Sequence, residues 1–165
     1  MDNAAISRPV KVAAVQAEPG WLNLQKSIDK VISLIENAGK KSVNVLRFPE
    51  VFVQGYPWSI WHHSPLSNVG FIHEYVNNSL VKESPEMDRI KKAVKAAGFF
   101  VVLGYSERDR GSIYIAQSFI NPDGEIIHHR KIKPTRVERS LWGDSQADPV
   151  KCVVDTKWGE VGGLN

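Results

Sequence analysis

The order of apolar runs in the first third of the chain constrains the fold most. Val10–Ala17 is a short β-rich run that Pro19 and Gly20 interrupt, and Val43–Phe48 is a second run of the same kind. Five apolar residues between these runs recur at spacings of three and four: Leu24, Ile28, Val31, Ile35 and Ala38. This spacing predicts one buried face of an amphipathic helix, which Gly39 would cap. Strand, helix and strand over this length indicate a right-handed crossover between parallel strands.

The middle of the chain adds two more helical patterns. The apolar spacing within 69–80 predicts a short helix. Ser84 and Pro85 supply an N-cap and a first helical proline for a stronger helix, which Gly98 ends.

An antiparallel meander is expected to follow. Its predicted strands are Phe99–Tyr105, Ser112–Ile120 and Glu125–Lys131, with turns at the charged segment Glu107–Gly111 and at Asn121-Pro-Asp-Gly124. Two last strands are expected over Val150–Val154 and Gly159–Leu164. The sequence therefore predicts an α/β layered domain with a mixed sheet, over residues 10–165, preceded by a tail at 1–9.

Composition excludes several classes of protein. A chain of 165 residues favours one domain, and a net charge of +3 from 21 basic and 18 acidic residues is nearly balanced. We therefore expect no nucleic-acid role, since no aromatic stacking platform accompanies the basic run 130–139. The polar start, the lack of a membrane-length apolar run and a single cysteine favour a cytoplasmic protein with no membrane association.

One carboxylate follows the second strand in a setting typical of small-molecule sites. Pro49 ends the strand, because proline lacks the donor that a ladder needs, and Glu50 comes next. The loop that follows carries Tyr56, Trp58 and Trp61, which provide aromatic walls. Glu50 taken alone is more simply interpreted as a solvated loop acid.

The second charged stretch contains Lys131 and Glu138. Lys131 closes a predicted strand and Glu138 follows in a segment predicted to be irregular. If both leave the sheet at the edge where Glu50 lies, the lysine would sit between two carboxylates and stay charged. Such a lysine stabilises a developing oxyanion while a carboxylate takes a proton. A solvated basic strand end is the alternative interpretation.

Histidine and cysteine give weaker patterns. His128 and His129 are adjacent and point to opposite faces of a strand, and His62 and His63 have the same defect, so we predict no metal site. Cys152 lies in a β-rich run without the Gly-rich turn or helix N-terminus that would activate a thiol. We expect it to be a packed sheet residue.

These segments together resemble the nitrilase branch of the carbon–nitrogen hydrolases, from about Val10 to the end of the chain. Six motifs carry the resemblance: Phe48-Pro-Glu50 with Gly55-Tyr-Pro57, Gly104-Tyr-Ser-Glu-Arg108, Asn121-Pro-Asp-Gly124, Arg130-Lys-Ile-Lys-Pro-Thr135, Val137-Glu-Arg139 and Gly162-Gly-Leu-Asn165. The aromatic loop after Glu50 is most similar to nitrilases and cyanide-hydrolysing enzymes. Arg47 and Ile115 depart from the family pattern, which usually has an apolar residue and an asparagine there.

The resemblance implies a Glu-Lys-Cys triad that hydrolyses nitriles to an acid and ammonia, or to an amide. Glu50 matches the general base, Lys131 the lysine that stabilises the tetrahedral intermediate, and Glu138 a second glutamate that positions substrate and lysine. The family cysteine directly follows the motif that ends at Asn165, so it is expected just beyond this sequence. No metal or organic cofactor is implied.

The resemblance also implies an αββα sandwich with mixed sheets, of which this chain holds the N-terminal portion. The C-terminal half would be missing, and apolar sheet surface would be exposed. Homo-oligomers are expected for the full-length form. Two other interpretations stay open: a catalytically inactive truncated member with an interaction role or none, and a general α/β binding module.

Overall fold

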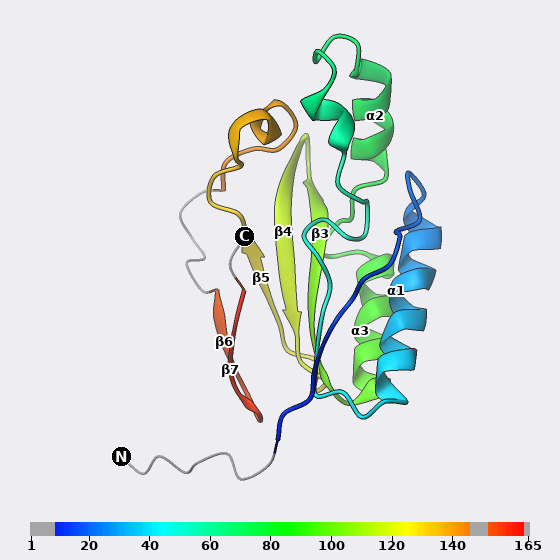
Figure 1. The fold of residues 1–165 in the computed structure, drawn as a ribbon, viewed down its shortest axis with the longest axis vertical. Coiled ribbons are helices and arrows are strands. Elements are labelled where there is room, and N and C mark those ends of the chain that lie inside the picture. The colour runs from blue at the N-terminus through cyan, green and yellow to red at the C-terminus, as the bar shows by residue number, and fades with distance from the viewer. Residues whose placement is uncertain (1–8, 146–151, 164–165) are drawn as a thin grey trace.

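The computed structural model describes residues 9–145 and 152–163 and is built on a five-stranded sheet (Figure 1). The strand order follows the sequence: β1 (Val12–Ala14), β2 (Val45–Arg47), β3 (Phe100–Asp109), β4 (Ser112–Ile120) and β5 (Ile126–Arg130). β1, β2 and β3 are parallel, whereas β3, β4 and β5 form an antiparallel meander. The predicted mixed sheet, with its parallel start, is confirmed.

Two long helices cover one face of this sheet (Figure 1). α1 (Leu24–Gly39) and α3 (Pro85–Ala97) pack on each other, and their apolar faces join the main core with strand residues such as Leu103 and Tyr105. Asn23 and Ser84 cap the two helices through their side chains. None of the described helices is long and apolar enough to cross a membrane.

The end of the sheet at which β2 finishes carries shorter elements. These are η1 (Trp58–Trp61), α2 (Val69–Asn77) and η2 (Arg136–Ser140). A second apolar cluster joins them to the sheet: Val51, Ile60, Tyr75, Ile113, Ile115 and Trp142.

The opposite face of the sheet is covered in part by a hairpin. β6 (Val153–Thr156) and β7 (Gly159–Gly162) are antiparallel, and Val154 packs against Phe100 and Phe119. An apolar groove of about 360 Å³ lies between this hairpin and β1–β2, and Val12 beside it is 66% exposed. The layering of helices, sheet and second sheet agrees with the predicted αββα sandwich.

Several element boundaries differ from the predicted ones. The prediction of a charged turn over Glu107–Gly111 is wrong for Glu107–Asp109, because these residues extend β3. The turn consists of Arg110 and Gly111. The predicted irregular segment around Glu138 is the 3₁₀ helix η2, and Lys40 rather than Gly39 caps α1. Most of the predicted tail 1–9 and the ends of the last two predicted strands lie outside the described residues.

Candidate active site

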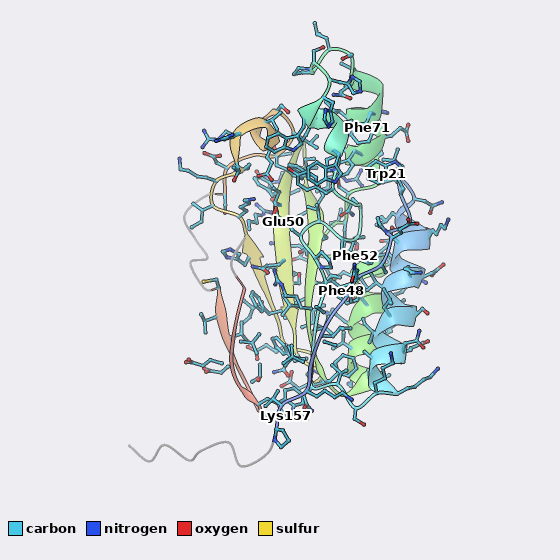
Figure 2. The ribbon with its side chains drawn as sticks, viewed as in Figure 1. Trp21, Phe48, Glu50, Phe52, Phe71 and Lys157 are labelled. Carbon is cyan, nitrogen blue, oxygen red and sulfur yellow. The ribbon has the colours of Figure 1, made fainter. Side chains whose placement is uncertain are left out.

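The loop after β2 places Glu50 above the sheet (Figure 2). It crosses β3 at Gly104, where any Cβ would overlap with the carbonyl oxygen of Pro49. The backbone of Val53 donates to Gly104 O at 3.3 Å, and Phe48 N donates to Val102 O at 2.8 Å. Glycine at position 104 therefore lets the Glu50 loop lie directly against the central strands.

The residue after Glu50 holds a strained backbone. Val51 has φ 45°, which is rare for a β-branched side chain and costs on the order of 1–3 kcal/mol. Its side chain is fully buried against the cluster that contains Tyr75. Tyr75 donates to Gly55 O at 2.9 Å, and Gln54 Oε1 accepts from the backbone of Ser106 at 2.7 Å. Packing and hydrogen bonds thus hold a loop geometry that the local sequence alone disfavours.

Lys131 and Glu138 follow β5, the edge strand at the end of the sheet order opposite β1. Lys131 follows β5, and its backbone N–H still donates to Ile115 O at 2.8 Å, so the ladder fixes where the side chain starts. Glu138 is the third residue of η2 and forms a capping box with Thr135. Thr135 N donates to Glu138 Oε2 at 2.6 Å, which orients the carboxylate.

The three charged groups meet. Lys131 Nζ lies 3.1 Å from Glu50 Oε1 and 3.1 Å from Glu138 Oε2, although Glu50 and Lys131 are 81 residues apart in sequence. The side chains of Lys131, Glu50 and Glu138 are 12%, 29% and 7% exposed. The proximity that the sequence predicts for these residues is observed, and solvent reaches the trio mainly at Glu50.

The two carboxylates keep the ammonium of Lys131 charged. Burial acts to lower the pKa of Lys131, but hydrogen bonds to Glu138 and Glu50 and the negative charges of both raise it above 10.5 overall. A compact cation with three N–H donors, two of them engaged by carboxylates, is suited to bind an anionic atom that approaches from the open side.

Aromatic side chains border the trio. Tyr56 O–H donates to Glu138 Oε1 at 3.0 Å and accepts from Trp61 Nε1 at 3.0 Å. The pKa of Tyr56 is raised to about 12, chiefly by burial and further by the hydrogen bond and charge of Glu138. The hydrogen bond from Trp61 acts to lower the pKa but is outweighed. Trp58 packs on Tyr56 with ring centroids 5.0 Å apart and is 66% exposed. Tyr56 thus touches the charged groups, while Trp58 forms an outer wall.

Two contributors escaped the sequence interpretation, and for Trp61, which it placed in the aromatic loop, the contact with Tyr56 was not predicted. The pattern Thr135-x-x-Glu138 is a capping box, which would have predicted the short helix. Gly104 inside an apolar strand is a known sign of close backbone approach. The contact of Trp61 with Tyr56 has no comparable sequence signal, because it depends on the path of the loop.

Other candidate residues lie elsewhere. Cys152 is half-buried and directly precedes β6, so the prediction that places it within a strand is wrong. His128 bonds with Ser118 at 2.8 Å on the helix face. Arg47 donates to Gln117 Oε1 at 3.2 Å, and Ile115 is buried with Trp142, so both departures from the family pattern are accommodated.

Comparisons with known proteins assign the family. The carbon-nitrogen hydrolase family model matches residues 11–165. A nitrilase from Talaromyces marneffei is 59% identical over 97% of this chain and 50% of its own length. A cyanide hydratase from Armillaria gallica is 48% identical over 94% of this chain and 44% of its own. The chain therefore spans about half the length of these curated relatives.

Solved structures agree on the fold. A CN-hydrolase superfamily protein from Xanthomonas campestris superposes with a TM-score of 0.71 at 14% identity, over 93% of this chain and 51% of that one. A nitrilase superfamily member from Saccharomyces cerevisiae gives a TM-score of 0.67 at 19% identity, over 93% of this chain and 54% of that one. The mixed sheet and the matched sequence motifs together show that this chain belongs to the carbon–nitrogen hydrolase family.

Proposed function

We propose that this chain supplies the general base and the oxyanion-stabilising lysine of a nitrilase-type hydrolase acting on small nitriles. The observation that carries the proposal is the ammonium of Lys131 held 3.1 Å from both Glu50 and Glu138, beside Tyr56. The relatives at 59% and 56% identity are named nitrilases, which favours organic nitriles over cyanide as substrates.

The nucleophile in this proposal is the thiol of a cysteine that follows the motif ending at Asn165 in a longer protein. Glu50 takes the thiol proton, and the thiolate adds to the nitrile carbon to give a thioimidate. Water then adds, and the ammonium of Lys131 stabilises the tetrahedral intermediate through the N–H that neither carboxylate engages. Loss of ammonia leaves a thioester, which a second water hydrolyses to the acid, whereas loss of the thiol releases the amide.

Each carboxylate has a separate task. Glu50 is the more exposed of the two, at 29% against 7% for Glu138, so it is the one that can reach a thiol and a water. Glu138 accepts from Lys131, Tyr56 and the Thr135 backbone, and these bonds commit it to holding the lysine. Glu50 is therefore the proposed base and Glu138 the proposed positioning residue.

The test joins the chain to the downstream half of the Talaromyces marneffei nitrilase, whose own length is about twice the matched region. Ammonia release from aliphatic and aromatic nitriles and from cyanide is measured for the 165-residue chain and for the chimera. We expect turnover from the chimera alone, lost in Glu50→Gln and retained in Glu125→Gln, which is exposed directly before β5.

Two outcomes would contradict the proposal. Turnover by the 165-residue chain that disappears in Cys152→Ala would relocate the nucleophile. A folded chimera that binds nitriles without turnover would favour the catalytically inactive alternative.

A further inference from the structure

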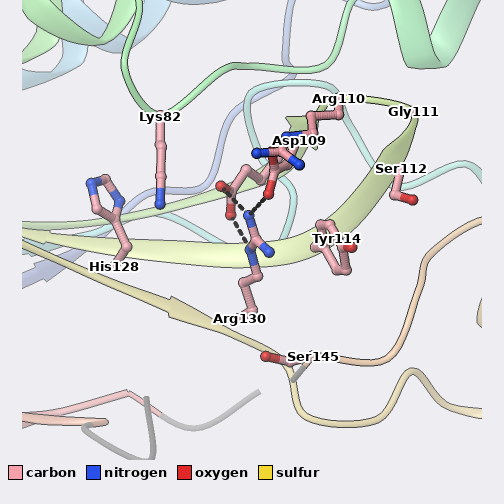
Figure 3. Close-up of a pocket in the computed structure, with 10 residues that line it drawn as sticks. Lys82, Asp109, Arg110, Gly111, Ser112, Tyr114, His128, Arg130 and Ser145 are labelled. Carbon is pink, nitrogen blue, oxygen red and sulfur yellow. Dashed lines mark hydrogen bonds and ion pairs between the residues drawn. The ribbon is translucent and has the colours of Figure 1, made fainter. Parts of the chain in front are cut away.

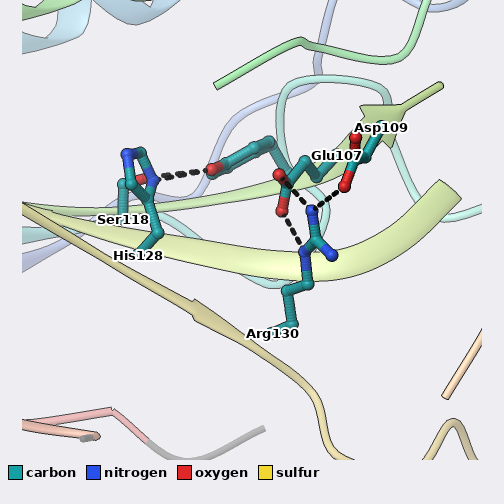
Figure 4. Close-up of polar contacts among 6 residues, drawn as sticks. Glu107, Asp109, Ser118, His128 and Arg130 are labelled. Carbon is teal, nitrogen blue, oxygen red and sulfur yellow. Dashed lines mark hydrogen bonds and ion pairs between the residues drawn. The ribbon is translucent and has the colours of Figure 1, made fainter. Parts of the chain in front are cut away.

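Arg130, the residue before Lys131, takes part in a second charged cluster (Figure 3, Figure 4). The strand register places this cluster on the helix face of the sheet, opposite the face of the trio. Its guanidinium donates from Nε to Glu107 Oε2 and from Nη2 to Glu107 Oε1, both at 2.7 Å, and from Nη2 to Asp109 Oδ2 at 2.8 Å. It also lies over the Tyr114 ring, 4.0 Å from the centroid. Two parallel hydrogen bonds to one carboxylate fix both distance and direction.

The register shows what this pair connects. Arg130 stands opposite Ala116 on β4, and Ala116 stands opposite Tyr105 on β3. Glu107 is two residues beyond Tyr105 on the same face. The Arg130 side chain therefore passes over β4, where Ala116 is small enough to leave room, and ties the end of β5 to β3.

Burial makes Glu107 the stronger of the two partners. Its side chain is 1% exposed, whereas that of Asp109 is 45% exposed and borders a cavity of about 540 Å³ beside the pair. A buried carboxylate without its partner is costly, so Glu107 holds Arg130 firmly. An exposed carboxylate such as Asp109 contributes little, since water replaces it readily.

Lys131 leaves the sheet at the point that this tie secures. Neighbouring residues on an extended chain face opposite sides, so fixing Arg130 toward the helix face directs Lys131 to the face where Glu50 and Glu138 lie. The last ladder bond of β5, from Lys131 N to Ile115 O, is adjacent to the tie.

We infer that the Glu107–Arg130 pair is a positioning device for Lys131, which keeps the end of β5 in register so that the lysine reaches both carboxylates. This role rests on the proposed function of Lys131. Neither residue of the pair touches the trio, so both act through the backbone of β5.

The test follows Lys131 in the 165-residue chain, without any substrate. NMR of ¹³C,¹⁵N-lysine gives the pKa of the Lys131 side chain, and amide exchange reports its ladder bond. In Glu107→Gln we expect the pKa to fall toward the ordinary lysine value and the Lys131 amide to exchange roughly ten or more times faster. The matched variant is Asp109→Asn, which removes the exposed partner of the same arginine and should change neither quantity.

A purely structural pair would behave differently. Glu107→Gln would then lower thermal stability while the pKa and amide exchange of Lys131 stay unchanged, and this result would overturn the inference. If Glu107→Gln does not fold, the double variant E107Q/R130M removes the tie without leaving an unpaired buried charge, and the same two readouts decide.

These readouts are independent of turnover. If Glu107→Gln changes the pKa and amide exchange of Lys131 but the chimera hydrolyses no nitrile, the positioning role is supported and the proposed function is refuted. If Glu107→Gln leaves the pKa and amide exchange of Lys131 unchanged while the chimera is active, the proposed function is supported and the positioning role is refuted.

Discussion

Arg130 and Lys131 are consecutive, both are cationic and both hold two carboxylates, yet their surroundings differ. The planar guanidinium of Arg130 donates two parallel hydrogen bonds to the carboxylate of Glu107, whose side chain is 1% exposed. Lys131 is a compact ammonium between two carboxylates, one from the loop after β2 and one from η2, and the first is 29% exposed. The first arrangement ties β5 to β3 through a carboxylate that is 1% exposed, and the second leaves one ammonium N–H that neither carboxylate engages.

The comparison teaches how one strand end serves two purposes. The side-chain period of two sends adjacent residues to opposite faces, so a structural pair and a candidate catalytic group are built side by side without touching. Substitutions at the two positions should therefore separate activity from stability.

The largest effect is expected on activity. Lys131→Met in the chimera should reduce turnover by about 10²–10³-fold, because the developing negative charge loses its nearest donor. Ammonia release measures the loss. Lys133→Met is the control, since Lys133 is 67% exposed and its ion pair with Asp144 at 3.6 Å lies outside the trio. Equal losses in both variants would assign the effect to general charge rather than to the Lys131 site.

The next largest effect is expected on the free energy of unfolding, and it tests the structural role of Arg130. Arg130→Met leaves Glu107 buried without its cation and should cost about 3–5 kcal/mol. Lys131→Met should cost less, because Glu138 keeps its donors Tyr56 and Thr135. Urea unfolding of the 165-residue chain ranks the two variants. A greater loss for Lys131→Met would reverse the assignment of structural and catalytic roles.

A third, smaller effect concerns the loop that brings Glu50 to Lys131. Gly104→Ala forces a methyl group against Pro49 O and should destabilise the fold by about 1–3 kcal/mol while displacing Glu50. Gly111→Ala is matched, since no atom lies within 4 Å of its would-be Cβ, and should stay within about 0.5 kcal/mol of wild type. Denaturant midpoints of both variants provide the measurement. Equal midpoints would show that the loop does not depend on close approach at position 104.

The smallest effect is expected in the pH dependence of stability, to which Tyr56 beside the trio contributes. The folded protein keeps the phenol proton up to a pKa of about 12, whereas the unfolded chain releases it near 10.0. The contribution of Tyr56 to stability is therefore intact below pH 10.0 and declines as the pH rises to about 12. Unfolding between these pH values, with Tyr56→Phe as reference, should show the extra slope in wild type alone. A slope that Tyr56→Phe leaves unchanged would mean that burial and Glu138 do not raise the pKa of Tyr56 in the folded protein.

Local sequence determined much of the architecture. Apolar spacing and the Ser84-Pro85 start predicted the two long helices, and Asn121-Pro-Asp-Gly124 predicted the β4–β5 turn. These features depend on neighbours within a few residues, where propensity and turn chemistry act. Motifs along the chain also indicated the family that the comparisons show.

Longer-range features were decided by the tertiary structure. The charged segment at Glu107 resembles a turn by composition. Because Arg130 offsets the cost of burying the Glu107 carboxylate, β3 continues to Asp109 instead. The positive φ of Val51 opposes its intrinsic preference and is held by packing around Tyr75.

The candidate site combines both levels. The sequence by itself supplied Glu50, Lys131 and Glu138 as residue types at strand ends, and the resemblance suggested that they meet. Their 3.1 Å contacts, and the partners Tyr56, Trp61 and Thr135, follow from strand order, register and the crossing at Gly104. Contacts between residues up to 82 positions apart form only when the sheet aligns the chain, which no local pattern specifies.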